Sequence, residues 1–545
     1  MKGGTLYFGD NLEVLRESIK DESVDLIYLD PPFNSNATYN VLFKTPKGHQ
    51  SDAQIEAFDD TWHWGHQAEA AFAELMQQSN TDVAEVIRAL RSMLGENDIM
   101  AYLTMMAIRL LELHRVLKRT GSLYLHCDPS ASHYLKILMD GIFGAEGFKN
   151  EIVWQRTNVH NDSKTWSRVS DTILFYSKGV TFTWNKPLAP HSDAHITSKY
   201  SNVDDVGRRY TQSDMTSPAP RPNMMYEWKG FLSPPNGWRY SKETMQRLDD
   251  ERRIWYPLTK EGALNTTKRP RLIRYLDEMS GTVLGNIWTD ISPINSQAQE
   301  RLGYPTQKPL ALLERIITAS SNEGDVVLDS FCGCGTAIHA AEKLKRKWIG
   351  IDVTHLAISL IEKRLRDAWP SITFEVHGTP KDFDGARNLA LRDKYQFQWW
   401  ACSLVNAQPY QGKKKGADSG IDGVIYFQDD DKLPKKIVIS VKGGENVGVS
   451  MLRDFAHVIE REKAAIGLFV TLTDPTKNMV TEGVGTGYYT SPLTGAKFPK
   501  LQVLTIEGLL AGTEQARYPR MDAGGLTFKK AKQEEPKADQ GKLSL

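Results

Sequence analysis

Two short segments hold the residues best suited to chemistry, and the first is Asp30-Pro31-Pro32-Phe33. It follows the apolar run VDLIYLD (24–30), which is typical of a strand buried on both faces of a parallel sheet. The prolines fix two φ angles and hold the preceding Asp30 in an extended pose. Acceptors converging there suit an exocyclic amino group, whose nitrogen they make more nucleophilic, and Phe33 offers a face on which an extruded base can stack. Taken alone, the segment also fits a strand-ending loop with a buried phenylalanine.

The second segment is the glycine-rich stretch Asp329-Ser330-Phe331-Cys332-Gly333-Cys334-Gly335-Thr336. It lies between an expected strand and an expected helix, where glycines let the backbone turn tightly and approach a ligand closely. Asp352 ends the next expected strand and is placed to accept hydrogen bonds from ribose hydroxyls. The pattern therefore fits nucleoside binding, and a plain tight turn stays an alternative. NAD and P-loop sites are disfavoured, because a third glycine and a Gly-Lys-Ser/Thr sequence are missing.

The cysteines indicate neither a metal site nor a disulfide framework. Cys332 and Cys334 have no second Cys/His pair at ligand spacing, so we expect no metal there. Four cysteines in 545 residues, with no signal-peptide pattern and no apolar run near the ~20 residues of a membrane span, predict a cytoplasmic protein. The 67 basic and 67 acidic residues balance, so bulk charge neither supports nor excludes nucleic-acid binding.

Apolar runs and periodicity predict an α/β fold, with a Rossmann-like sheet that is interrupted by an irregular insertion. Strands are expected at 6–8, 24–30, 122–128, 325–329 and 347–352, and helices within 66–118 and at 130–143, 309–320 and 336–345. A further α/β region has expected strands at 421–427, 436–442 and 464–472, and an expected helix at 397–404. We expect domains at 1–157, 158–300, 301–380 and 385–515, and a disordered tail at 520–545.

Together these motifs resemble the amino-methyltransferases of DNA, in the circularly permuted arrangement called the β class. In that class the catalytic motif precedes the cofactor motif, with a target recognition domain between them. Here Asp30–Phe33 precedes Phe331–Gly335, and the 158–300 region lies between.

The resemblance implies S-adenosylmethionine as the cofactor and assigns roles to individual residues. YPTQKP (304–309) resembles the segment that binds the methionine end of the cofactor, which would place Thr306 and Lys308 near its carboxylate. Asp10 resembles the residue that contacts the cofactor's adenine. Asp329, Phe331, Gly333, Gly335 and Asp352 complete the implied cofactor site. Asp before the prolines favours adenine N6 over cytosine N4, while Phe33 departs from the family's common Tyr but keeps the stacking face.

The 158–300 region is expected to read double-stranded DNA. It supplies basic residues that can bind guanine edges or phosphates, interleaved with aromatic ones. They are Arg208, Arg209, Arg221, Arg239, Lys268, Arg269, Arg271 and Arg274, with Trp228, Trp238 and Tyr240. The alternative is that the aromatic residues form a small core and the arginines a solvated face.

The C-terminal region resembles restriction-endonuclease-like domains of the Mrr or PD-(D/E)xK type. The matching positions are Asp422, Ser440 and Lys442, where a family member would hold Mg²⁺. Ser440 stands where an acidic or amide ligand is expected and weakens a site for a hard cation. The region is therefore either an active nuclease, making the chain a bifunctional restriction-modification enzyme, or a DNA clamp without catalysis. Further expected partners are a second copy of the chain or restriction or defence subunits, with no membrane.

Overall fold

The computed structural model describes most of the chain, in two compact units. The described residues are 3–32, 38–44, 50–59, 63–78, 80–159, 165–279, 281–295, 298, 300–302, 304, 306–410, 420–429, 434–519, 527 and 531–534. One unit contains Met1–Asn185 and Asn286–Leu545, and the other contains Lys186–Gly285. No helix among these residues is long and apolar enough to cross a membrane.

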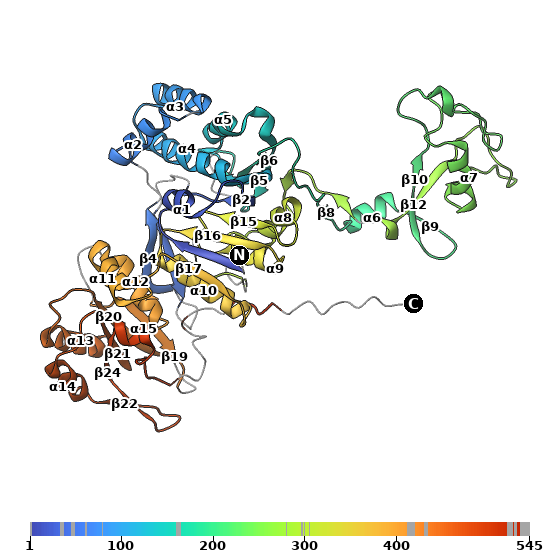
Figure 1. The fold of residues 1–545 in the computed structure, drawn as a ribbon. Helices are drawn as coiled ribbons and strands as arrows, with labels where there is room; N and C mark the ends of the chain where they lie inside the picture. Colours follow the sequence, from blue (N-terminus) through green and yellow to red (C-terminus); the bar gives the residue numbers. More distant parts are fainter. Residues whose placement is uncertain are drawn as a thin grey trace. The chain divides into compact units, whose positions relative to one another are not determined.

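A nine-stranded sheet organises the first unit (Figure 1). Its strands, in spatial order, are β14 (Ile287–Trp288), β6 (Phe148–Gln155), β7 (Ser170–Ser177), β5 (Leu117–Cys127), β2 (Val24–Leu29), β15 (Val326–Asp329), β16 (Lys347–Asp352), β1 (Gly4–Phe8) and β17 (Phe374–His377). The strands from β5 to β17 are parallel, whereas β7 runs antiparallel to both β5 and β6. The doubly wound, Rossmann-like fold predicted for this part of the chain is confirmed.

Strand β2 lies beside β15, although about 300 residues separate them in sequence. Leu26 pairs with Val327 and Tyr28 pairs with Asp329, in parallel register. Parallel strands end at one edge of a sheet, so the segments that follow β2 and β15 meet there.

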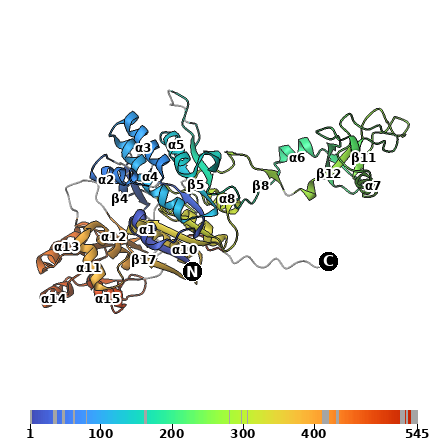
Figure 2. The same ribbon diagram turned by 45° about the horizontal axis from the view of Figure 1, so that its top comes forward.

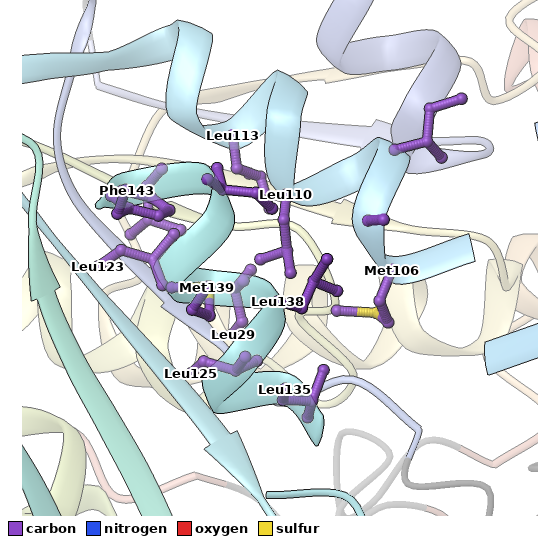
Figure 3. Packing of buried hydrophobic residues seen from close by; sticks show 14 of the residues in the cluster. Leu29, Met106, Leu110, Leu113, Leu123, Leu125, Leu135, Leu138, Met139 and Phe143 are labelled. Carbon is purple, nitrogen blue, oxygen red and sulfur yellow. The ribbon is translucent and has the colours of Figure 1, made fainter. Parts of the chain in front are cut away.

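Helices cover both faces of this sheet, because alternate residues of each buried strand point to opposite sides. On β2, Ile27 and Leu29 belong to one core cluster, and Leu26 and Tyr28 belong to another. Figure 3 shows the first cluster, where Leu110 and Leu138 pack near Leu29. Its helices are α1 (Asn11–Ser18), α2 (His66–Leu75), α3 (Thr81–Leu94), α4 (Asp98–Val116) and α5 (Ser132–Phe143), and the second cluster uses α8 (Leu310–Ser320), α9 (Thr336–Lys343) and α10 (His355–Ala368). Helices α3, α4 and α5 gather on one side in both views (Figures 1 and 2).

The second unit, Lys186–Gly285, is shorter than the expected insertion of 158–300. That expected range took in β7 and β14, which are strands of the nine-stranded sheet. The unit contains a four-stranded sheet, a two-stranded sheet and two helices. They are β11 (Ile254–Trp255), β12 (Arg271–Tyr275), β10 (Arg209–Asp214) and β9 (Asn202–Val203); β8 (Leu188–Ala189) with β13 (Thr282–Val283); and α6 (Asp193–Lys199) with α7 (Lys242–Asp250).

A five-stranded sheet organises the C-terminal region. Its strands, in spatial order, are β18 (Gln408–Pro409), β19 (Gly423–Phe427), β20 (Lys435–Lys442), β21 (Ile466–Thr471) and β24 (Leu501–Thr505). The helices are α11 (Phe383–Arg392), α12 (Lys394–Leu404), α13 (Val449–Arg461), α14 (Lys477–Gly485) and α15 (Ile506–Ala511). Two small hairpins pair β3 (Thr38–Lys44) with β4 (Gln50–Asp59) and β22 (Tyr488–Thr490) with β23 (Lys497–Pro499). Among the described residues, 3₁₀ helices are η1 (Ala145–Gly147), η2 (Pro222–Met224) and η3 (Leu276–Glu278).

Two described pieces of the tail differ from the disordered segment expected after residue 520. Thr527 is 2% exposed, and its hydroxyl bonds to both the backbone nitrogen and the backbone oxygen of Tyr426, each at 3.0 Å. Glu534 lies 3.4 Å from His339 and 3.7 Å from Lys343, both on α9. The expectation of disorder was wrong at these residues, because a polar, proline-containing composition does not reveal single residues that bond to a folded surface.

Candidate active site

Four acidic residues stand at the carboxyl ends of neighbouring strands. Asp10 follows β1, Asp30 follows β2, Asp329 ends β15 and Asp352 ends β16, and these strands are adjacent in the order β2-β15-β16-β1. They line one cavity of about 300 Å³. Of the predicted site residues, the cavity is lined by Asp10, Asp30, Pro31, Pro32, Thr306, Lys308, Asp329, Phe331, Gly333 and Asp352. Phe33 lies outside the described residues.

The glycine-rich turn needs glycine at two positions. Gly333 has φ +49°, and its backbone nitrogen donates to Asp352 Oδ2 at 2.9 Å. Gly335, which does not line the cavity, has φ +75° at the start of α9, and a Cβ there would meet Ile361 Cγ1 at 2.6 Å. Such φ values strain any residue that carries a Cβ. Both glycines therefore set the shape of the loop, and only Gly333 faces the cavity.

Two of the cavity's carboxyl groups titrate far from their ordinary range. Burial raises the pKa of Asp352 to about 6 and the pKa of Asp329 to about 8. Asp352 already accepts hydrogen bonds from Gly333 and from the backbone and hydroxyl of Thr354, each at 2.9 Å. Each carboxylate oxygen has two acceptor positions, so Asp352 can still accept from a bound hydroxyl.

Asp10 is held by protein groups as well as lining the cavity. Its Oδ1 accepts from Leu12 N at 2.8 Å and so caps α1, and its Oδ2 lies 2.8 Å from Arg109 Nη2. Arg109, 4% exposed, also donates to Asn11 Oδ1 at 2.6 Å, and Asn11 Nδ2 donates to the Ser330 carbonyl at 2.9 Å. A buried chain thus ties the β1 loop to the glycine-rich turn. Sequence reasoning missed Arg109, although a single charge within the apolar run LTMMAIRLL was a usable signal.

Lys308 contacts Asp30 directly. The Lys308 ammonium forms an ion pair with Asp30 Oδ2, and the two side chains are 11% and 15% exposed. The resemblance placed Lys308 near the carboxylate of a cofactor, while the structure places it on the carboxylate that precedes the prolines. Residues 278 positions apart therefore join the segment after β2 to the segment before α8.

The cysteines of the turn are buried, and burial raises the pKa of both thiols. Across the part of the chain that the structure describes, no group of three or more His, Cys, Asp and Glu side chains could hold a metal ion.

The three predicted residues of the C-terminal region lie on adjacent strands. Asp422 immediately precedes β19, its Oδ2 accepts from Val441 N at 2.6 Å, and its backbone nitrogen donates to the Ile439 carbonyl at 2.8 Å. Ser440, 2% exposed, and Lys442 alternate along β20 and so share one face. The geometry brings Asp422 to these two residues, with a hydroxyl where a metal site would use a carboxylate or an amide.

Comparison with known proteins agrees with this arrangement. Residues 24–363 match the DNA methylase family of N6 and N4 enzymes, and residues 391–484 match a restriction endonuclease family. The Type II methyltransferase M.EcaI of Enterobacter cloacae is 30% identical over 362 residues, which cover 66% of this chain and 68% of that protein.

Two other relatives are similar over smaller shares of their length. The Type III restriction-modification enzyme StyLTI Mod subunit of Salmonella typhimurium is 27% identical over 62% of this chain and 50% of its own. The DNA adenine methyltransferase YhdJ of Escherichia coli is 46% identical over 15% of this chain and 28% of its own. The chain belongs to the DNA methylase family, as an S-adenosylmethionine-dependent amino-methyltransferase that carries a restriction-endonuclease-type domain at its C-terminal side.

Proposed function

We propose that the chain methylates adenine N6 in a specific DNA sequence, on a base turned out of the duplex. The observation that carries this proposal is the shared cavity, since Asp30, Pro31 and Pro32 line the same space as Gly333 and Asp352. A hydrogen-bond acceptor for an amine and a binding site for a nucleoside are then part of one cavity, which brings the two reactants together.

The residues of the cavity fit S-adenosylmethionine by their chemistry. Asp352 offers acceptors to ribose hydroxyls, and Gly333 lets the backbone approach closely. Asp10, Asp30 and Asp329 add carboxyl oxygens that can accept hydrogen bonds from the amino groups of this ligand. The cofactor supplies an electrophilic methyl group on a sulfonium.

Asp30 and the Pro31 carbonyl have the task of orienting the amine. They accept hydrogen bonds from its protons, and the nitrogen lone pair then faces the methyl group. One N–H proton must leave as the N–C bond forms, and the Asp30 carboxylate can accept it. Lys308 compensates the charge of Asp30 in this largely buried place.

Two observations favour adenine. Aspartate stands before the prolines, and YhdJ, which is named a DNA adenine methyltransferase, is among the relatives. Long-read sequencing of DNA from cells that express the chain tests the proposal. We expect N6-methyladenine in one sequence context, lost in Asp30→Ala. N4-methylcytosine in its place would refute the base assignment, and unmodified DNA would refute the activity.

We assign DNA reading to the Lys186–Gly285 unit. Its two predicted tryptophans are not free to contact bases, because Trp228 and Trp238 are 4% and 0% exposed in its core, whereas Tyr240 is half-buried. Arg208 is held by Asp277 and Glu278 and lies 3.7 Å from the ring centre of Tyr275. Of the basic residues predicted to read DNA, the exposed ones are Arg209, Arg221, Arg239, Lys268, Arg269 and Arg271.

The cluster Lys268, Arg269 and Arg271 offers the sharpest test of that assignment. Changing all three to alanine should weaken DNA binding and reduce its dependence on salt, because each phosphate contact releases counterions. S-adenosylmethionine affinity should stay unchanged. Equal DNA affinity and an equal salt dependence in wild type and variant would contradict the role.

A second candidate activity is DNA cleavage by the C-terminal domain, favoured by the family match and by the placement of Asp422 beside β20. It requires Mg²⁺ bound at Asp422 with help from the Ser440 hydroxyl, and Lys442 near the scissile phosphate. Magnesium-dependent nicking of unmethylated DNA that is lost in Lys442→Ala would support it. Intact DNA at high enzyme concentration would leave the domain as a DNA clamp.

The similarity to a Mod subunit also favours a separate restriction subunit as partner. Sedimentation of the purified chain, alone and with such a subunit, distinguishes a monomer, a homodimer and a mixed complex.

A further inference from the structure

A buried network of polar side chains crosses three neighbouring strands, and one of its members lines the cavity. Tyr28 on β2, His126 on β5 and Asp171 on β7 lie on strands adjacent in the sheet. Tyr28 Oη is 3.0 Å from His126 Nδ1, and His126 Nε2 is 3.0 Å from Asp171 Oδ2. All three side chains are at most 2% exposed. Buried polar groups lower the stability of a protein unless they are paired, so these three side chains are expected to have a role beyond packing.

Arg156 contacts Asp171, at the end of this network that lies farthest from Tyr28. Its Nε lies 3.2 Å from Asp171 Oδ1, and its side chain is 42% exposed. Burial acts to raise the pKa of Asp171, but its interactions with His126, Arg156 and Lys308 outweigh burial and lower it. Asp171 is therefore an ionised carboxylate, which can only accept hydrogen bonds.

An ionised Asp171 beside a neutral His126 fixes the direction of both hydrogen bonds between these side chains. His126 Nε2 must donate to Asp171. In a neutral imidazole Nδ1 then carries the lone pair, so Tyr28 donates its hydroxyl proton to Nδ1. With its proton committed, the Tyr28 oxygen can act toward any other group only as an acceptor.

Tyr28 also lines the cavity, and it lies on β2 two residues before Asp30. We propose that His126 is a neutral imidazole in this place and that the Tyr28 oxygen, held as an acceptor by His126 and Asp171, receives a hydrogen bond from an N–H group of a bound substrate. The donor is either the exocyclic amine of the target base or the ammonium group of the cofactor. Tyr28 is then a binding residue, and His126 and Asp171 are positioning residues. The identity of the two donors rests on the proposed function.

Asp171→Asn should reverse the direction of both hydrogen bonds among Tyr28, His126 and residue 171, while the side chain keeps nearly the same shape. The Arg156 cation lies 3.2 Å from the Oδ1 position and attracts the amide oxygen there, so we expect the amide NH₂ group to face His126 Nε2. Nε2 must then accept, Nδ1 carries the proton and donates to the Tyr28 oxygen, and the Tyr28 hydroxyl proton turns toward the cavity. The Tyr28 hydroxyl and the N–H group of the substrate would then both be donors, and no hydrogen bond could form between them.

The test uses the full chain as Tyr28→Phe, Asp171→Asn, the double variant and Tyr124→Phe. Tyr124 is the matched control. It pairs with Tyr28 in register on β5, is 2% exposed and bonds to Ser320 Oγ at 2.7 Å, but it does not line the cavity. Three quantities are measured: the Kd for S-adenosylmethionine by calorimetry, the single-turnover methylation rate at saturating cofactor and DNA, and the melting temperature.

We expect Tyr28→Phe to lose about tenfold in one of the first two quantities, as for one hydrogen bond, and Asp171→Asn to lose more. The double variant should match Tyr28→Phe, because without the hydroxyl there is no proton to redirect. A loss in Kd identifies the cofactor ammonium as the donor, and a loss in rate at saturation identifies the base amine. Tyr124→Phe should stay within about twofold in both.

The proposal is overturned if Tyr28→Phe stays within about twofold of wild type in both quantities. It is also overturned if the losses of the two single variants add in the double variant, or if Tyr124→Phe loses as much. A wild-type chain that binds the cofactor but methylates no DNA would refute the proposed function instead, and the Kd comparison would then decide the inference alone.

Discussion

Replacing Gly335 with alanine tests whether the glycine-rich turn is shaped by packing or by backbone freedom alone. Two costs add at this position. Holding an alanine at φ +75° costs about 1–2 kcal/mol. The new Cβ would also lie 2.6 Å from Ile361 Cγ1, and forcing a methyl into a packed core costs about 1–3 kcal/mol more. Ile361 is fully buried and β-branched, so its side chain cannot turn away.

The loop must therefore shift, and its shift reaches the cavity through Gly333 and Cys334. We expect Gly335→Ala to bind S-adenosylmethionine at least about tenfold more weakly, which corresponds to about 1.4 kcal/mol. Calorimetric titration of the purified chain measures this, and circular dichroism melting measures the accompanying loss of stability.

Gly512 provides the matched control, because it is also left-handed, with φ +71°, but a Cβ there would meet nothing within 4 Å. Gly512→Ala should lower stability by the backbone cost alone and leave cofactor affinity unchanged. Adding Ile361→Ala to Gly335→Ala should recover most of the affinity, although the new cavity costs stability. Equal cofactor affinities in Gly335→Ala and Gly512→Ala would refute the packing explanation.

Three further predictions follow from the site and the tail. Asp352 has a pKa raised to about 6, and ribose hydroxyls favour its ionised form, so cofactor affinity should fall about tenfold per pH unit below pH 6 and level off above it. Asp352→Asn should remove this pH dependence, and a single Kd for the wild-type chain from pH 5 to 7.5 would contradict the prediction. Lys308→Met leaves Asp30 largely buried without its ion-pair partner, so the single-turnover methylation rate should drop about 100-fold, and Lys308→Arg should retain more of the rate. An undiminished rate in Lys308→Met would show that the ion pair has no function in methylation. Thr527→Val removes the hydroxyl that bonds to the Tyr426 backbone and should destabilise the C-terminal domain by about 1–3 kcal/mol in thermal melts. Thr513 is exposed, so Thr513→Val should change stability by less than about 0.5 kcal/mol, and equal effects of the two variants would show that the Thr527 contact contributes nothing.

Local patterns in the sequence were enough to predict the strands and turns that build the site. Apolar runs marked β2, β15 and β16, because a strand buried on both faces must be apolar over its whole length. Prolines and glycines marked the segments after β2 and β15, because their constraints on φ act within one or two residues. The order of these motifs along the chain then indicated the family and its circularly permuted arrangement.

The tertiary structure alone decided which side chains meet. The Lys308–Asp30 pair joins residues 278 positions apart, and Arg109 reaches Asp10 across 99 positions. His126 and Asp171 appear as ordinary strand residues until the sheet order brings them beneath Tyr28. The bounds of the inserted unit and the contacts of Thr527 likewise emerged only from the fold. The physical reason is that backbone preferences are set by nearest neighbours, whereas the pairing of a buried charge or hydroxyl depends on which distant segment excludes water from it.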